Sequence, residues 1–142
     1  MSIMPKKTRN PRRKMSSREQ RDLDVEIVFL EGVIQRDRDY VEALQILGDD
    51  YTRRDRFEDG LRIDRRLVVL RPRDALVHYN LACSYSLTQQ CEMAVEALNT
   101  AINLGYKDFD WMAKDPDLKH LREHAGYKRI QARVRCLFAK ET

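Results

Sequence analysis

A 34-residue internal repeat is the feature of this chain that most restricts what it can fold into. The first copy reads Leu44-x-x-Leu47-Gly48-x-x-Tyr51, and the second reads His78-x-x-Leu81-Ala82-x-x-Tyr85. A period of about 34 residues with a large residue, leucine, a small residue and tyrosine at this spacing is typical of helix–turn–helix repeats that stack on one another. The chain is therefore predicted to be all-α, built as a solenoid of helix pairs.

Length and composition fit a thin helical array. The chain has 142 residues, of which 42% are hydrophobic and 35% charged, and repeats that touch only their neighbours leave a large surface to water. No run approaches the roughly 18 apolar residues of a membrane helix, and the charges that begin at Lys6 argue against a signal peptide. Three cysteines without a C-x-x-C pair predict free thiols in a reducing compartment, and hence a cytoplasmic protein.

The positive charge is concentrated in an N-terminal arm. Residues 1–21 hold eight Lys and Arg side chains against Glu19 alone, a net charge of +7, whereas the whole chain carries +4. Residues 1–17 are predicted to be a disordered basic arm, because they bury too little apolar surface to offset their ordering entropy. The arm is either a solubilising tail or, as an alternative function, an adaptor that docks on nucleic acid or an anionic membrane surface. No aromatic residue is interleaved with its cations, so base stacking has no support.

The first helix is predicted over about residues 18–37, and its expected inward face is Val25, Val28, Phe29, Gly32 and Val33. These residues recur at i, i+3, i+4, i+7 and i+8, the spacing of one helix face.

Four further helix boundaries follow from capping chemistry. Asp39, with Glu42 in the capping-box position, is expected to begin the second helix. The third helix carries Phe57 and stops before Pro72, which cannot continue a helix. Asp74 is expected to cap the fourth helix, and Gly105 to end the fifth with a left-handed residue.

Two segments of the chain resemble the tetratricopeptide repeat, residues 41–74 and 75–108. The residues that carry the resemblance are Leu47-Gly48, Tyr51, Phe57 and Pro72 in the first segment, and Leu81, Ala82, Tyr85, Ala94 and Ala101 in the second. Leu44 and His78 stand where the family usually has tryptophan. The string Asp115-Pro116-Asp117-Leu118 before Leu121-Arg122 resembles the last repeat of bacterial members of this family. With half-repeats at both ends, the resemblance implies one repeat domain over residues 18–142, with a final helix over about 127–139 whose residues Ile130, Val134, Leu137 and Phe138 face inward.

The resemblance implies a right-handed superhelix that acts as a protein–protein interaction scaffold. A partner segment, extended or helical, would lie on the concave face lined by the first helix of each repeat. Carried onto this chain, the binding positions are Gln45, Asp49, Thr52, Arg53, Tyr79, Asn80, Cys83, Ser86 and Leu87. Arg53, Tyr79 and Asn80 are the expected anchors, because arginine and tyrosine are enriched at interface hot spots.

Enzymatic readings have little support in the sequence. His120-Leu121-Arg122-Glu123-His124 matches the H-x-x-E-H string of some zinc proteases, but a third ligand and a cleft are also needed. Cys83 and Cys91 have no cation next to them in the sequence, so packing roles are favoured over reactivity. The acidic pairs Asp49-Asp50 and Glu58-Asp59 are interpreted as solvated. No enzymatic activity, cofactor or metal is expected.

Overall fold

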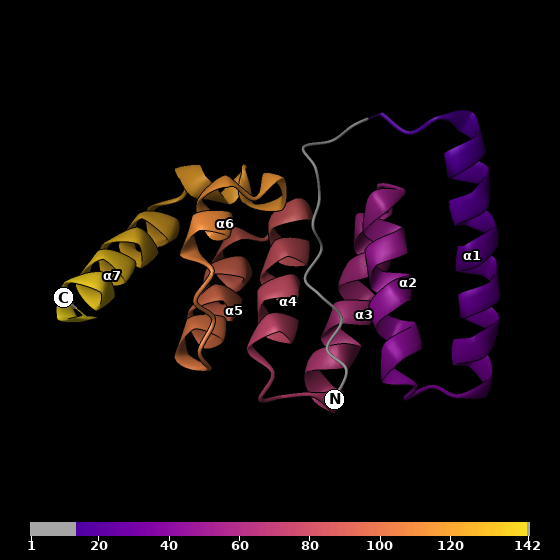
Figure 1. Cartoon of the computed structure of the whole chain (residues 1–142), viewed down its shortest axis with the longest axis horizontal. Helices are drawn as coiled ribbons and strands as arrows, with labels where there is room; N and C mark the ends of the chain where they lie inside the picture. The colour runs from indigo at the N-terminus through magenta and orange to yellow at the C-terminus, as the bar shows by residue number, and fades with distance from the viewer. Residues whose placement is uncertain (1–13, 142) are drawn as a thin grey trace. The chain divides into compact units, whose positions relative to one another are not determined.

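The computed structural model describes residues 14–141, and every element in that range is helical (Figure 1). The α-helices are α1 (Ser17–Arg36), α2 (Val41–Arg53), α3 (Phe57–Leu70), α4 (Ala75–Leu87), α5 (Cys91–Asn103), α6 (Phe109–Lys114) and α7 (Ala125–Glu141). Two short 3-10 helices, η1 (Pro116–Leu118) and η2 (Leu121–Glu123), lie between α6 and α7. The predicted all-α class is confirmed. No helix among the described residues is both long and apolar enough to cross a membrane.

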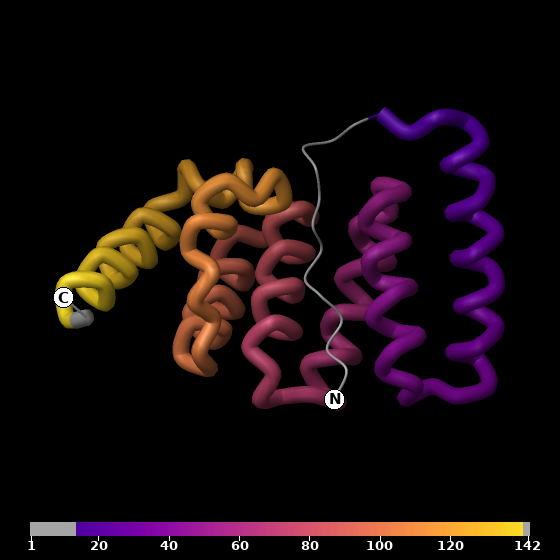
Figure 2. The backbone as a smooth tube through the Cα atoms, in the orientation of Figure 1, coloured from indigo at the N-terminus to yellow at the C-terminus, as the bar shows by residue number. Residues whose placement is uncertain are grey.

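The chain divides into two compact units, the first ending at Pro72 and the second beginning at Arg73, where the sequence predicted a single repeat domain. In the first unit α1 packs against α2, and α2 packs against α3, as the backbone trace also shows (Figure 2). In the second unit α5 packs against α4 and α7, and η1 lies against α4. Most of the predicted basic arm, residues 1–13, lies outside the described residues.

α1 begins with a complete capping box. The Ser16 hydroxyl accepts a hydrogen bond from Glu19 N at 3.1 Å, and Ser16 N donates to the Glu19 carboxylate at 3.3 Å. This arrangement satisfies two backbone groups that the first turn leaves without helical partners. The folded chain therefore begins by Ser16, inside the segment that was predicted to be disordered.

The predicted inward face of α1 is wrong. The side chains that α1 buries are Leu23, Ile27 and Leu30, whereas Val25, Val28 and Phe29 are 70%, 67% and 68% exposed. Both sets recur at helical spacing, so periodicity alone cannot choose between them. The packing of α1 against α2 makes the choice, and it buries Leu23, Ile27 and Leu30.

The predicted cap of α2 is also wrong. The residue before α2 is Tyr40, which makes no side-chain capping hydrogen bond. Asp39 instead forms an ion pair with Arg66 on α3. The carboxylate thus links the start of α2 to its partner helix rather than closing the first turn.

Glycines allow close approach of α2 and α3. A Cβ atom on Gly48 would lie 3.2 Å from Ile63 Cγ2, and one on Gly60 would lie 3.0 Å from Thr52 Oγ1. Both distances are shorter than ordinary van der Waals contact, so a larger residue would force the helices apart. Small residues thus mark the crossing of these two helices.

The hairpins α2–α3 and α4–α5 are built on one register. α2 and α4 begin at Val41 and Ala75 and end at Arg53 and Leu87, so both boundaries differ by 34 residues. Each hairpin turns through one left-handed residue at the same offset, Asp55 with φ 59° and Gln89 with φ 61°.

The hydrogen bonds of the two turns match as well. Arg56 N donates to Tyr51 O at 2.8 Å, and Gln90 N donates to Tyr85 O at 2.8 Å. Each bond joins residues five apart, as in the outer hydrogen bond of a Schellman C-cap. The sequence repeat therefore corresponds to a repeat of backbone geometry, down to the strained residue of the turn.

Two further boundary predictions in the second unit are confirmed. The Asp74 carboxylate accepts from Leu76 N at 2.9 Å and caps α4, and Gly105 follows α5 with φ +108°. In addition, the Asp115 carboxylate accepts a hydrogen bond from Asp117 N at 3.0 Å and so caps the 3-10 helix η1.

α7 buries only part of its predicted inward face. Ile130 and Val134 are buried and Leu137 is half-buried. Phe138 is 51% exposed, so its predicted inward position is wrong. Its ring meets the edge of Phe109, with ring centroids 5.7 Å apart.

Candidate interaction surface

Three of the four predicted binding positions on α2 are accessible. Gln45 and Asp49 are half-buried and Arg53 is exposed, so all three can contact another molecule. Thr52 is 1% exposed, and its hydroxyl donates to Gly48 O within the same helix at 3.0 Å. Its assignment as a partner contact is therefore corrected to a packing role beside Gly60.

The predicted positions on α4 are mostly inside the second unit. Tyr79 is 0%, Cys83 is 2% and Ser86 is 1% exposed, while Asn80 and Leu87 are half-buried. A side chain without accessible surface cannot anchor a partner in this conformation. The interpretation of Tyr79 as an interface anchor, and of Cys83 and Ser86 as contacts, is therefore wrong.

Tyr79 is covered by the segment that follows α6. Its phenol donates to Asp115 Oδ2 at 2.6 Å, and its ring stacks on Tyr106 with centroids 4.2 Å apart. Burial, reinforced by Cys83 and Asp115, raises the pKa of Tyr79 far above its ordinary value. The hydroxyl therefore keeps its proton and remains a hydrogen-bond donor to Asp115.

Arg122 fixes the same segment from the other side. Its guanidinium donates to Met112 O at 2.9 Å and to Asp115 O at 2.8 Å. Leu118 and Leu121 are both 0% exposed in this segment. The Asp-Pro-Asp-Leu string with its following Leu-Arg is thus a closure of the second unit, held by Tyr79 of α4 and by Arg122.

The buried side chains Cys83, Asp115 and Asp117 are the one group of potential metal ligands found among the described residues, with ligand atoms within 4.8 Å of one another. Asp115 Oδ2 accepts from the Tyr79 phenol and also from Cys83 Sγ at 3.7 Å, and Asp115 Oδ1 accepts from Asp117 N. Donors within the chain thus occupy both oxygens of Asp115. The cluster is a capping network, and its mixture of one thiol with two carboxylates matches no common metal preference.

An acidic residue is buried between the helices of the first unit. Asp50 is 2% exposed, so its interpretation as a solvated charge is wrong, and Asp49 beside it is half-buried. Burial, followed by a hydrogen bond and charge repulsion from Glu26, raises the pKa of Asp50 to about 8. At neutral pH Asp50 is largely protonated and can share its proton with Glu26 of α1.

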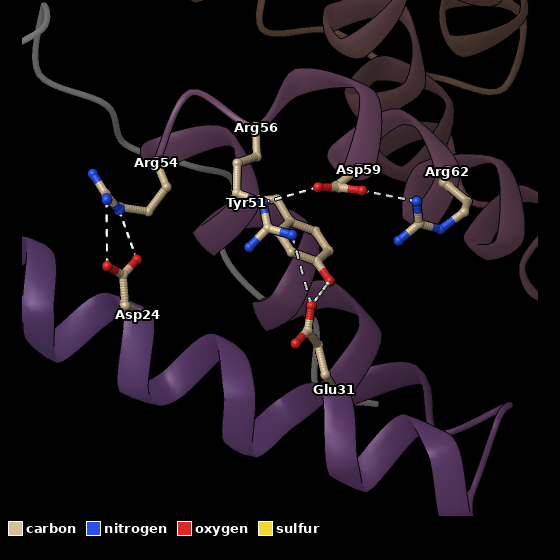
Figure 3. Close-up of polar contacts among 7 residues, drawn as sticks. All are labelled: Asp24, Glu31, Tyr51, Arg54, Arg56, Asp59 and Arg62. Atoms are coloured by element: carbon tan, nitrogen blue, oxygen red, sulfur yellow. Dashed lines mark hydrogen bonds and ion pairs between the residues drawn. The ribbon is translucent and has the colours of Figure 1, made fainter.

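A polar network joins α1 to the turn between α2 and α3 (Figure 3). The Tyr51 phenol donates to Glu31, and the Arg56 guanidinium lies 4.6 Å from the centre of the Tyr51 ring. Arg54 Nε donates to Asp24 Oδ1 at 2.7 Å. Burial, then the hydrogen bond and charge of Glu31, raise the pKa of Tyr51 to about 12. These contacts hold α1 at a fixed position along α2.

Asp59 completes this network on α3. Burial works to raise the pKa of Asp59, but hydrogen bonds from Arg62 and Arg56 outweigh it and hold that pKa below its usual range. The two guanidinium contacts measure 2.8 Å from Arg62 Nη1 and 2.9 Å from Arg56 Nε. Of the acidic pair Glu58-Asp59, only Glu58 is exposed as predicted, and Asp59 is a half-buried, paired charge.

The histidines of the H-x-x-E-H string do not share a helix face. Residues 121–123 form the 3-10 helix η2, so His120 and His124 lie outside any α-helical turn that would align them. His124 Nδ1 accepts from Gly126 N at 3.0 Å, and its Nε2 lies 3.4 Å from Glu92 Oε1. His124 thus accepts a backbone hydrogen bond in the first turn of α7 and lies against Glu92 of α5.

The sequence did not predict two features of this region, the burial of Asp50 and the contact between Tyr79 and Asp115. The repeat itself held the signal for Asp50, because the residue 34 positions later is Ser84, which is also buried. A small polar residue at that register marks an inward position. The Tyr79–Asp115 contact spans 36 residues, and nothing in the local pattern around Tyr79 indicates it.

No protein-family model matches the chain. A chloroplastic protein of Arabidopsis thaliana is similar to it, with 32% identity over 96 residues. The similar region covers 66% of this chain and 27% of that protein. The chain therefore matches about a quarter of the length of this relative.

Proposed function

We propose that the chain is a tetratricopeptide-type interaction module, a right-handed solenoid segment that binds a partner protein on the concave face lined by its first helices. The single observation that carries the proposal is the 34-residue repeat of helix boundaries, left-handed turn residues and capping bonds in α2–α3 and α4–α5. Repeats of this kind expose extended surfaces that other proteins use for binding.

Two hydrogen-bond acceptors on these helices have no partner among the described residues. Asp49 Oδ1 and Asn80 Oδ1 are enclosed, and neither accepts a hydrogen bond from any described residue. Enclosed polar atoms without partners are costly, and they are commonly satisfied by water or by a ligand. Both side chains are half-buried, so a rotation that exposes either oxygen offers an acceptor to a partner's backbone N–H groups, lysine or arginine.

The proposed contact residues are now a smaller set than the sequence suggested. They are Gln45, Asp49 and Arg53 on α2, and Asn80 and Leu87 on α4. Tyr79, Cys83, Thr52 and Ser86 support these helices from inside. Function as an adaptor, without enzymatic chemistry or a cofactor, is part of the same proposal.

The test compares two charge-exchanged variants in capture experiments from the native extract, read by quantitative mass spectrometry. Asp49→Lys with Arg53→Glu reverses two charges on α2 without changing the net charge. The matched control, Glu58→Lys with Arg65→Glu, does the same at exposed positions of α3. We expect partners to be lost with the α2 variant and retained with the α3 variant. Equal retention by both would contradict a binding role for α2.

A second pair of samples separates this function from docking by the basic arm. Deletion of residues 1–13 removes most of the arm and keeps Ser16, which caps α1. We expect the same partners to be captured by the truncated chain at moderate salt. Loss of every partner on truncation would instead favour an electrostatic adaptor for nucleic acid or anionic membranes, whose binding falls steeply with salt.

The cellular location is proposed as the cytoplasm, on the ground that the three cysteines are free thiols. The name of the Arabidopsis relative places that protein in the chloroplast, which is a different compartment. Imaging of a C-terminal fluorescent fusion in the source cells distinguishes the two locations.

A further inference from the structure

The outward face of α1 is an apolar surface without a partner in the described chain. Val25, Val28 and Phe29 are 70%, 67% and 68% exposed, the three highest exposures among large hydrophobic residues of α1. Gly32 and Val33 continue the same face at helical spacing. Single exposed hydrophobic residues are ordinary, but a contiguous stripe on one helix marks an interaction surface.

Gly32 gives a second and independent indication. Glycine in a helix interior destabilises the helix by about 0.5–1 kcal/mol relative to alanine. At Gly48 and Gly60 a packed neighbour explains the glycine, because a Cβ atom would meet a side chain within 3.2 Å and 3.0 Å. A Cβ atom on Gly32 would meet nothing within 4 Å. Nothing inside the described chain therefore requires glycine at this position, whereas close approach of another helix would.

We propose that this face, the α1 outer face (Val25, Val28, Phe29, Gly32 and Val33), binds α1 of a second copy of the chain as an antiparallel helix pair. Two-fold self-pairing is the commonest form of protein oligomer, and it requires a surface that is complementary to itself. The α1 outer face meets that requirement in both shape and charge.

Shape complementarity follows from the antiparallel register. When the two-fold axis passes between Val28 and Phe29, Val25 of each copy faces Gly32 of the other. The bulky side chain then meets the position that has none, and the two Phe29 rings meet beside the axis. This matches large residues with small ones across the contact, as closely packed helices require.

Charge complementarity follows from the same register. Asp22 and Arg36 lie at the two ends of the apolar stripe, and both side chains are exposed. In the antiparallel pair Asp22 of one copy lies within one residue of Arg36 of the other at both ends, and the exposed Arg21 lies opposite Arg36 as well. A parallel pair would instead place Asp22 beside Asp22 and Arg36 beside Arg36. The charges thus favour the antiparallel arrangement.

The contact runs from Asp22 to Arg36, about 21 Å of helix at 1.5 Å per residue. An interface of one helix face is small compared with the roughly 800 Å² per partner of stable complexes. We therefore expect the dimer to be weak. Its dissociation constant is measured by sedimentation equilibrium of the full chain between about 10 µM and about 1 mM.

Two variants test the face itself. Phe29→Glu places a charge beside the two-fold axis and is expected to weaken dimerisation at least about tenfold. The matched control is Val69→Glu, because Val69 is 68% exposed on α3 and lies outside the proposed contact. The control is expected to dimerise like the wild type. A wild-type chain that stays monomeric at the highest concentration, or a dimer that Phe29→Glu leaves unchanged, would overturn the proposal and assign the face to a different protein or segment.

A charge exchange tests the antiparallel register. Asp22→Arg places like charges beside Arg36 at both ends of the dimer and is expected to weaken it by about three- to tenfold. Arg36→Asp alone is expected to have a smaller effect, because repulsion by Asp22 is offset by attraction to Arg21 opposite it. The double variant restores the pairs and is expected to recover wild-type association. Each single variant is also checked by circular dichroism, so that a folding defect is separated from a binding defect. A double variant that dimerises no better than Asp22→Arg alone would contradict this register.

Discussion

The phenol of Tyr79 on α4 donates a hydrogen bond to Asp115 at 2.6 Å, across 36 residues of sequence. Tyr79 was expected to bind a partner, but its hydroxyl donates to a carboxylate of its own chain instead. The same carboxylate accepts Asp117 N and so starts η1. One side chain therefore both caps a turn and fastens that turn to the helix beneath it.

Loss of the phenol is expected to destabilise the second unit. Tyr79→Phe removes the donor and leaves a buried carboxylate short of a partner, which costs about 1–3 kcal/mol of the free energy of unfolding. Trp111, the single tryptophan of the chain, lies in this unit and provides a fluorescence signal for urea unfolding. The control is Tyr40→Phe, because Tyr40 is 45% exposed and should tolerate the change within about 0.5 kcal/mol. Equal effects at both tyrosines would contradict the assigned role.

Asp50 is expected to make stability fall as pH rises. Its pKa is raised from 3.8 to about 8 in the folded chain, so the folded state holds a proton that the unfolded state releases. Stability from this group is complete below about pH 4 and declines to about pH 8, by up to about 1.4 kcal/mol per pH unit. Asp50→Asn mimics the protonated acid and should remove this decline in urea unfolding followed by circular dichroism. The same slope in variant and wild type would show that Asp50 is not the group responsible.

Glycine at the second hairpin turn is expected to stabilise the fold. Gln89 has φ 61°, a left-handed conformation that costs a side chain about 1–2 kcal/mol and glycine almost nothing. After the greater entropy of unfolded glycine is subtracted, Gln89→Gly should raise the free energy of unfolding by about 0.5–1 kcal/mol. Glu96→Gly in the interior of α5 should lower it by about 1 kcal/mol. If Gln89→Gly also destabilises the chain in thermal unfolding, the turn does not hold the strained conformation described.

Two glycines are expected to respond in opposite directions to one methyl group. A Cβ atom at Gly126 would lie 2.7 Å from Val95 Cγ2, so Gly126→Ala should cost about 1–3 kcal/mol through overpacking against a stiff branched side chain. At Gly32 no atom lies within 4 Å, and Gly32→Ala should gain about 0.5–1 kcal/mol in dilute protein. Both values come from chemical denaturation below the concentration at which α1 pairs. A stabilising Gly126→Ala would mean that α7 does not pack closely on α5.

The sequence predicted the fold well where the repeat itself carried the information. The period placed both hairpins, and Asp74 and Gly105 marked their ends because caps are local chemistry. The face of α1 was not predictable in this way, since Leu23, Ile27 and Leu30 compete with a second stripe of equal periodicity. The neighbouring helix α2 decides which stripe is buried, and the sequence of α1 alone does not show on which side α2 packs.

The candidate site was predicted less well, for a related reason. Family positions place Tyr79 on the binding face of α4, but the segment that covers it lies more than 30 residues away and is recognised only once folded. Gln45, Asp49 and Arg53 on α2 stayed accessible. Local pattern therefore found the helices and their registers, whereas long-range closure decided which positions remained available.

The closure over α4 also makes Cys83 a natural reporter of opening in the second unit. Cys136 is exposed and Cys91 is half-buried, but Cys83 is 2% exposed beneath Asp115. A thiol reagent should modify Cys136 at once and reach Cys83 only when the closing segment lifts from α4. The rate of Cys83 modification therefore reports how often this segment opens, and no residue has to be introduced to measure it.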